Sequence, residues 1–178
     1  LNYPGVDATH FQPLGIEREA SVLSVGSLNP SKGHDFVIKS VGMINKEVRP
    51  KVKIIYSSEH YRVDYKVQLA RLAKRLGVTV QFDSLITDDE LVKAYNSAWI
   101  TACPNLLEPL GLVALESMAC GTPVVGVAEA GIRETMGLAH RAEPAGERPP
   151  GAVAGAVALD AAGGRPPGAV AGAVALDA

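Results

Sequence analysis

The sequence predicts an α/β fold, a Rossmann-like, doubly wound parallel sheet formed by residues 21–140. Short apolar runs alternate with segments of helical periodicity from residue 21 to about residue 136. Helical segments of about 10–15 residues are long enough for right-handed crossovers, which make the strands they join parallel. The 178 residues are 47% hydrophobic and 20% charged, which is typical of a soluble domain with its own core.

The first strand and the first helix are predicted on either side of a glycine-containing loop. Residues 21–25 form a short apolar run, as expected for a buried strand. Residues 35–48 are expected to be helical. Their apolar side chains recur close to helical spacing, at Phe36, Val37, Val41 and Ile44.

Two further strands enclose the second helix. Residues 51–56 (KVKIIY) and 78–82 (VTVQF) are short apolar runs and are predicted strands. Residues 64–76 carry an apolar helical face, and Gly77 stands where a helix commonly ends in a left-handed residue. The apolar face consists of Val67, Leu69, Leu72, Ala73 and Leu76.

A capping box opens the third helix. The Thr87 hydroxyl can accept a hydrogen bond from the Glu90 amide, while the Glu90 carboxylate reaches back to Thr87. We expect this helix to continue to about residue 97 and the fourth strand to occupy residues 98–103.

The fourth helix and fifth strand follow. We expect the helix to span residues 110–120, with Pro109 at a favourable first position and Gly121 ending it. The fifth strand is predicted at residues 123–127 (PVVGV).

The chain outside the predicted domain divides into two parts. Residues 1–20 are expected to be an inter-domain linker. Residues 141–178 form a tail rich in alanine, glycine and proline, in which residues 148–161 recur letter for letter at 165–178, 17 residues later. This tail is interpreted either as a low-complexity extension or sequence artefact, or as one helix followed by its duplicate. Two copies are too few for a solenoid.

Composition argues against several function classes. The net charge of −2 and the lack of a long basic run disfavour nucleic-acid and anionic-membrane partners. Cys103 and Cys120 belong to no C-x-x-C or Cys/His cluster, so we expect core thiols and no metal site. No apolar run approaches the roughly 20 residues of a spanning helix. Because the chain begins at Leu1, we expect a fragment or processed form.

A phosphate-binding loop is one candidate at the edge where parallel sheets bind ligands, outside the carboxyl ends of the strands. Residues 26–33 follow the first predicted strand and contain Gly26, Ser27 and Lys32. Glycine allows close backbone approach and lysine supplies positive charge for a phosphate. The spacing matches neither Walker A nor G-x-G-x-x-G, so a solvated loop lysine is the alternative interpretation.

A second candidate follows the fourth strand. The unpaired amides of Gly111, Leu112 and Val113 at a helix start would bind a diphosphate. If the helix is extended back to Glu108, Glu108 and Glu116 lie about 80° apart around its axis, so both could face one ligand. Because carboxylates accept hydrogen bonds from paired hydroxyls, Glu116 could bind a ribose diol and Glu108 a sugar ring. The alternative interpretation is that Glu108 caps the helix and Glu116 is a solvated helical residue. The rest of the helix is strongly apolar, however, which favours a functional role for an acidic residue within it.

A third candidate is the segment 82–86, after the third predicted strand, which could receive a nucleotide base. A plain strand-to-helix loop is the alternative.

The run from Glu108 to Val125, EPLGLVALESMACGTPVV, resembles the signature of glycosyltransferase family four, in which two glutamates are separated by seven residues. Segments 3–13, 25–33 and 130–134 are similar to further segments of that family in order and spacing. The resemblance covers about residues 1–136. It implies the C-terminal, donor-binding domain of a retaining enzyme with the GT-B fold, in which two Rossmann-like domains face each other across a cleft.

The resemblance also implies residue roles. Lys32 would bind the donor's diphosphate, Glu108 the hydroxyls of the donor sugar, and Glu116 the ribose, while Leu85 would contact the base. Lys32 and Glu108 are the expected catalytic residues. The expected substrate-binding residues are Gly26, Ser27, Lys32, Leu85, Glu108, Leu110, Gly111, Leu112 and Glu116.

The implied activity is transfer of a hexosyl group from a nucleotide diphosphate sugar to an unknown acceptor, with no metal or other cofactor. The acceptor-binding N-terminal domain is not in this chain, so we expect nucleotide binding but little sugar transfer. Ser27 replaces the family's usual arginine, Leu110 its phenylalanine and Ser84 a common glycine. The expected location is the cytoplasm, with peripheral attachment at the inner membrane face as an alternative.

Two other functions remain compatible with the sequence. One is a catalytically inactive nucleotide-binding or interaction module on the same fold, which Ser27 favours. The other is a different GT-B-like enzyme, such as a sugar-nucleotide epimerase, which the combination of Lys32, Glu108 and Glu116 disfavours. A metal-dependent GT-A enzyme would carry a D-x-D motif, and the sequence has none.

Overall fold

Parallel strands form one sheet in the computed structural model, which describes residues 5–57, 63–84, 86–105, 108–127, 130–141 and 156–159. The strand order is β3-β2-β1-β4-β5-β6, and every recorded pair is parallel. This arrangement confirms the predicted fold class. The strands are β1 (Glu19–Val25), β2 (Lys51–Tyr56), β3 (Val80–Ser84), β4 (Ala98–Cys103), β5 (Val124–Val127) and β6 (Ala156–Leu159).

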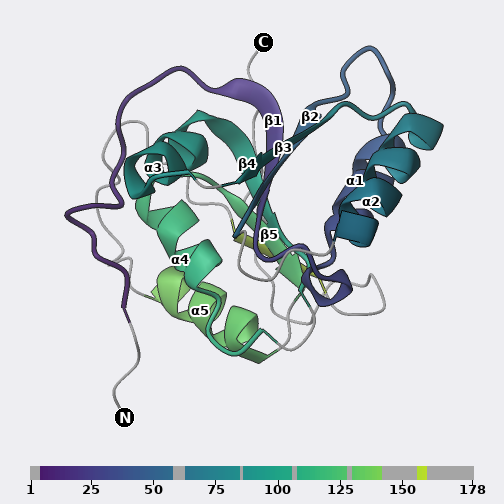
Figure 1. The fold of residues 1–178 in the computed structure, drawn as a ribbon. Helices are drawn as coiled ribbons and strands as arrows, with labels where there is room; N and C mark the ends of the chain where they lie inside the picture. The colour runs from purple at the N-terminus through teal and green to yellow at the C-terminus, as the bar shows by residue number, and fades with distance from the viewer. Residues whose placement is uncertain are drawn as a thin grey trace.

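Helices cover both faces of the sheet, as Figure 1 shows: α1 and α2 lie on one side, and α3, α4 and α5 on the other. Their bounds, with the short 3-10 helix η1, are η1 (Pro30–Lys32), α1 (His34–Gly42), α2 (Val63–Leu76), α3 (Asp88–Ser97), α4 (Leu112–Ala119) and α5 (Ala130–Arg141).

Apolar side chains fill the space on each side of the sheet. Ile54 of β2 and Leu69 of α2 belong to the cluster beneath α1 and α2. Leu23 of β1 and Tyr95 of α3 belong to a cluster on the opposite face, and a third cluster lies around Val124 beneath α4 and α5. Successive strand residues alternate between these faces, so the pleat assigns each side chain to one layer.

The first helix ends earlier than its apolar pattern predicts, at Gly42 instead of residue 48. An added Cβ at Gly42 would lie 3.2 Å from the Leu76 side chain, so α1 and α2 approach closely there. The Arg49 guanidinium donates hydrogen bonds to the carbonyls of Gly42 and Ile44, and also to Leu76 and Gly77. It thereby satisfies carbonyls at the ends of both α1 and α2, which have no partner within their helices.

The third strand begins at Val80, two residues later than predicted. Gly77 adopts a left-handed conformation (φ 64°), as expected for a helix end. The amides of Gly77 and Val78 donate to the carbonyls of Lys74 and Ala73, the pair of bonds that defines a Schellman motif. Val78 therefore belongs to the motif that terminates α2, and the strand starts after it.

The capping box of the third helix is confirmed. The Thr87 hydroxyl accepts from the Glu90 amide at 3.3 Å, and the Thr87 amide donates to the Glu90 carboxylate at 2.7 Å. The helix starts at Asp88 and ends at Ser97.

The fourth helix starts later than predicted, at Leu112 instead of residue 110, so Pro109 is not its first residue. Gly111 is the N-cap residue and adopts a left-handed conformation (φ 69°), which interrupts the helix before Leu112. An added Cβ at Gly111 would lie 2.9 Å from Cδ1 of Ile132, so the position also needs a residue without a side chain.

The described part of the predicted linker packs on the domain. The Leu14 amide donates to the Asn96 side chain at 2.7 Å, and Arg18 donates to the carbonyls of Ala98 and Gly121. The strand β1 begins at Glu19, inside the segment assigned to the linker.

A strand also forms within the alanine-rich tail. Residues Ala156–Leu159 pair in parallel with Val124–Val127, so the helical interpretation does not hold for these four residues. Pairing satisfies the backbone groups along the free edge of β5, and this tertiary context outweighs the helix propensity of alanine. The rest of the repeat, residues 142–155 and 160–178, lies outside the described residues.

Candidate functional site

The candidate site lies where the direction of the sheet order reverses. β1 and β4 are neighbours, but the chain leaves them toward opposite edges of the sheet, to β2 and to β5. In an open parallel sheet, the crevice outside the carboxyl ends of such a strand pair is the usual ligand site. The predicted phosphate loop follows β1, and the segment with Glu108 follows β4.

The structure joins these two loops by an ion pair. Lys32 Nζ lies 2.9 Å from Glu108 Oε2, although the residues are 76 positions apart in sequence. The side chains are 30% and 18% exposed, so the pair is partly shielded from water and still open to a ligand. Two residues predicted to bind one donor molecule thus contact each other.

Asn105 is a third member of this cluster that the sequence analysis missed. Its amide Nδ2 donates to Glu108 Oε2 at 2.6 Å, and the residue is only 8% exposed. A polar residue in the loop after a buried strand, three positions before a candidate carboxylate, was the available signal.

The environment of Glu108 favours its ionised form. Burial raises the pKa of this carboxyl, but hydrogen bonds from Lys32 and Asn105, together with the Lys32 charge, hold the pKa below its usual value. The Gly111 amide, which the sequence predicted to bind an anion, also lowers the pKa of this carboxyl.

Two glycines bring the loops together. An added Cβ at Gly26 would lie 3.3 Å from Cγ and Cδ of Lys32, so the lysine stem crosses directly over that residue. Gly33, with φ 68°, would place a Cβ 2.8 Å from Cγ of Pro104, which belongs to the loop after β4. The close approach that the sequence predicted for Gly26 therefore positions Lys32.

Glu116 lies on α4 and makes a different contact. Its Oε2 accepts a hydrogen bond from the Tyr95 hydroxyl of α3 at 2.6 Å. Burial raises the pKa of Glu116, the Tyr95 bond lowers it, and the negative charge of Asp88 raises it, so that it lies above its usual value. Tyr95 was not predicted, although a buried tyrosine generally needs a partner for its hydroxyl.

The charges of three predicted site residues act on the thiol of Cys103. This buried thiol ends β4. Burial raises its pKa to about 12, the charges of Glu108 and Glu116 raise it, and the charge of Lys32 lowers it. Glu108 precedes the helix, so the predicted wheel angle does not describe its relation to Glu116. Both carboxylates nevertheless lie near the carboxyl end of β4.

The start of α4 lies beside this cluster and supplies amides without a partner inside the helix. The first bonds of the helix run from the Ala114 and Leu115 amides to the Gly111 carbonyl. The amides of Leu112 and Val113 therefore have no partner within the helix, as expected for a helix start. Leu110 and Leu112 expose 40% and 39% of their surface, so this end of the helix is accessible.

Ser27 lies next to a buried histidine that was not singled out in the sequence. His34 is 0% exposed, and its Nδ1 lies 2.8 Å from the Ser24 hydroxyl. Its Nε2 lies 3.2 Å from the Ser27 carbonyl. Burial lowers the pKa of His34, so the neutral ring holds the start of the phosphate loop to β1.

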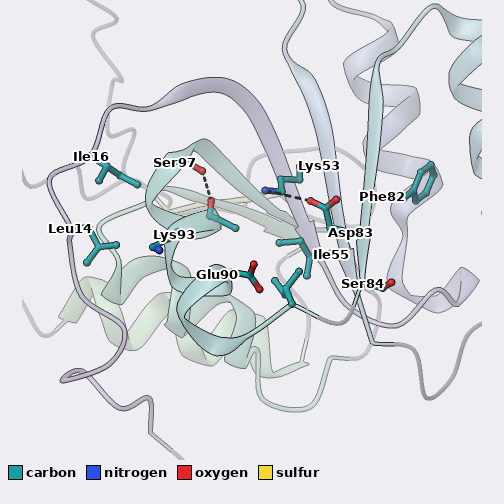
Figure 2. Close-up of a pocket in the computed structure, with 12 residues that line it drawn as sticks. Leu14, Ile16, Lys53, Ile55, Phe82, Asp83, Ser84, Glu90, Lys93 and Ser97 are labelled. Atoms are coloured by element: carbon teal, nitrogen blue, oxygen red, sulfur yellow. Dashed lines mark hydrogen bonds and ion pairs between the residues drawn. The ribbon is translucent and has the colours of Figure 1, made fainter.

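Leu85, the predicted base contact, lies outside the described residues. The residues on either side, Ser84 and Ile86, line a groove of about 750 Å³ next to α3. Figure 2 shows the groove between the N-terminal segment, β2, β3 and α3, with Lys53 and Asp83 paired at 3.5 Å. Lys32, Glu108 and Glu116 do not line it.

Two features are absent from the described part of the chain. In that part of the chain, no helix is long and apolar enough to cross a membrane. Histidine, cysteine and acidic side chains there do not gather in groups of three or more that could hold a metal ion.

Comparison with known proteins gives one family match. A family model described as "Glycosyl transferases group 1" matches residues 6–143. A D-inositol 3-phosphate glycosyltransferase of Frankia alni is 31% identical over 150 residues, which cover 75% of this chain and 37% of that protein. The chain thus spans less than half the length of such curated relatives.

Solved structures share the fold. Sucrose-phosphate synthase of Thermosynechococcus elongatus matches with a TM-score of 0.67 and 25% identity, over 86% of this chain and 38% of its own. The Anabaena protein HepE, solved in complex with UDP and glucose, matches with a TM-score of 0.65 and 23% identity, over 74% and 39% of the two chains.

Proposed function

The chain belongs to the glycosyl transferases group 1 family, and from this premise we propose that it is the donor-binding domain of a retaining hexosyltransferase of family four. The donor is a nucleotide diphosphate sugar, and the acceptor is bound by the N-terminal domain of the two-domain GT-B fold. The observation that carries the proposal is the Lys32–Glu108 ion pair at the reversal point of the sheet.

The diphosphate binds between Lys32 and the start of α4. The Lys32 ammonium, 2.9 Å from Glu108, exchanges its carboxylate partner for a phosphate oxygen. The amides of Leu112 and Val113, which have no partner within the helix, supply further donors at its positive end. Both groups stabilise the negative charge that develops on the leaving diphosphate as the sugar departs.

The two carboxylates bind hydroxyl groups. Glu108, ionised and released from Lys32, accepts hydrogen bonds from the hydroxyls of the donor sugar. Glu116, on the side of α4 that faces α3, accepts from the ribose. The segment around Leu85 contacts the base. No metal or other cofactor takes part in this scheme. The expected location of the protein is the cytoplasm, with peripheral attachment to the inner membrane face as an alternative.

Calorimetric titration of the chain with UDP, GDP and ADP tests the proposal. We expect saturable binding of one nucleotide, which identifies the base, and loss of binding in Lys32→Ala and Glu116→Ala. Lys51→Ala is a matched control, because this lysine also pairs with a glutamate but is the first residue of β2, at the opposite end of the sheet. Absence of binding by a chain shown to be folded would contradict the donor-site assignment.

A catalytically inactive nucleotide-binding module is the second candidate function. Ser27 stands where the family usually has arginine, so the phosphate loop carries one positive charge fewer. Combining the Ser27→Arg variant with a separately supplied N-terminal domain distinguishes the two functions. A gain in sugar transfer supports the enzyme, whereas nucleotide binding without any transfer supports the module.

A further inference from the structure

Tyr95 is held rigidly inside the core. Its side chain is 0% exposed. Its ring meets the Phe11 ring edge-on, with ring centres 6.2 Å apart, and its backbone carbonyl accepts a hydrogen bond from the Thr122 hydroxyl at 2.7 Å. An aromatic ring packed in this way keeps its hydroxyl at a fixed point.

That fixed hydroxyl reaches the candidate site. It donates to Oε2 of Glu116 at 2.6 Å, a length typical of a strong bond to an ionised acceptor. Within the residues that the structure describes, Tyr95 is the one recorded hydrogen-bond donor to this carboxylate. The bond connects α3 to α4, so the position of Glu116 depends on a residue 21 positions earlier in the sequence.

We propose that Tyr95 is a positioning residue for ribose recognition: it fixes one carboxylate oxygen of Glu116 and leaves the other to accept from the ribose hydroxyls. The inference rests on the proposed function, in which Glu116 receives the ribose. A carboxylate that is already held loses less rotamer freedom on binding, so Tyr95 increases nucleotide affinity without touching the nucleotide.

The charge state of Glu116 depends on the same contact. Four titratable groups interact electrostatically with Glu116. They are Tyr95 and Asp88 of α3, Cys103 of β4, and Cys120, which directly follows α4. Burial raises the pKa of the Cys103 thiol to about 12 and of the Cys120 thiol to about 11, so both are neutral near pH 7. Burial and Asp88 raise the pKa of Glu116, and the Tyr95 hydrogen bond opposes them.

The Tyr95→Phe variant tests the proposal, because it removes only the hydroxyl. We would titrate it with UDP and with 2′,3′-dideoxy-UDP, or with the corresponding GDP or ADP pair if the unmodified chain selects that base. The affinity for UDP should fall about tenfold, as expected for one charge-assisted hydrogen bond. The affinity for the dideoxy nucleotide should stay within about twofold, because that ligand has no diol for Glu116 to bind.

Two variants serve as controls. Glu116→Gln should remove the preference for UDP over the dideoxy nucleotide. Tyr65→Phe is matched to Tyr95→Phe, since Tyr65 is also buried and its hydroxyl contacts the Asp35 carboxylate at 3.4 Å, on the other face of the sheet. It should leave the preference unchanged. The ratio of two dissociation constants does not depend on the folded fraction, so partial unfolding of a variant cannot imitate the effect.

A pH series gives a second readout. Loss of the Tyr95 bond raises the pKa of Glu116 further, so UDP affinity in Tyr95→Phe should fall at a higher pH on acidification than in the unmodified chain. Equal weakening of both nucleotides, or an unchanged preference and pH profile, would overturn the positioning role. If the unmodified chain shows no preference, or Glu116→Gln retains it, the ribose assignment itself fails and this inference fails with it.

Discussion

Replacement of Glu108 by glutamine should strengthen the binding of a nucleoside diphosphate. In the ligand-free chain the phosphate must displace the Glu108 carboxylate from Lys32, 2.9 Å away. The substitution removes that competing charge but keeps an oxygen that can accept from Asn105. Lys32 is then available to the phosphate without the cost of breaking an ion pair.

The size of the effect follows from the exposure of the pair. Two charges at 4 Å attract by about 4 kcal/mol at an effective dielectric constant near 20, whereas fully exposed pairs contribute about 0–1 kcal/mol net. With side chains 30% and 18% exposed, the Lys32–Glu108 pair lies between these limits. We adopt about 1–1.4 kcal/mol, because side-chain entropy and desolvation offset most of the attraction. This predicts a roughly five- to tenfold gain in affinity.

Calorimetry with the selected nucleoside diphosphate measures this gain. Lys32→Met should weaken binding at least tenfold, and the opposite signs of the two variants would identify competition for Lys32. Glu19→Gln is the control, since it removes the carboxylate of the Lys51–Glu19 pair, 2.7 Å long, at the other end of β1. Weaker or unchanged binding in Glu108→Gln would refute the reasoning that Glu108 and phosphate compete.

Three further predictions concern the scaffold that holds the site. Because burial depresses the pKa of His34, the unfolded chain binds more protons than the folded chain below pH 6.5. The free energy of unfolding, measured in urea, should therefore decrease as the pH is lowered below about 6.5, and it should decrease less steeply in His34→Gln. Arg49→Ala should lower the free energy of unfolding by about 1–3 kcal/mol, as carbonyls at two helix ends lose a charged donor; Arg49→Lys, with fewer donors, should recover only part in the same experiment. Gly33→Ala should lower the free energy of unfolding by about 1–3 kcal/mol and weaken nucleotide binding, because φ is 68° and the added Cβ would clash with Pro104. Equal stability of variant and parent would contradict this packing.

The sequence was sufficient to predict the first five strands and the edge of the sheet where the candidate site lies, but not β6. Alternation of apolar runs with helical segments determines the crossovers, and these place the loops after β1 and β4 side by side. Lys32 and Glu108 could therefore be assigned to one edge. Boundaries were less predictable, because Arg49 ends α1 and Gly111 delays α4 through contacts with distant parts of the chain.

The side-chain partners within the site could not be predicted from local patterns. The Lys32–Glu108 contact joins residues 76 positions apart, and the Tyr95–Glu116 bond depends on how α3 packs against α4. Such contacts are set by the packing of whole elements, which periodicity does not specify.

A crystal structure of the chain grown with the nucleoside diphosphate selected by titration tests the central claim most directly. The account predicts the diphosphate between Lys32 Nζ and the amides of Leu112 and Val113, with Lys32 no longer bonded to Glu108 and the ribose hydroxyls at Glu116. A diphosphate bound instead in the groove beside α3, with the Lys32–Glu108 pair intact at 2.9 Å, would contradict it.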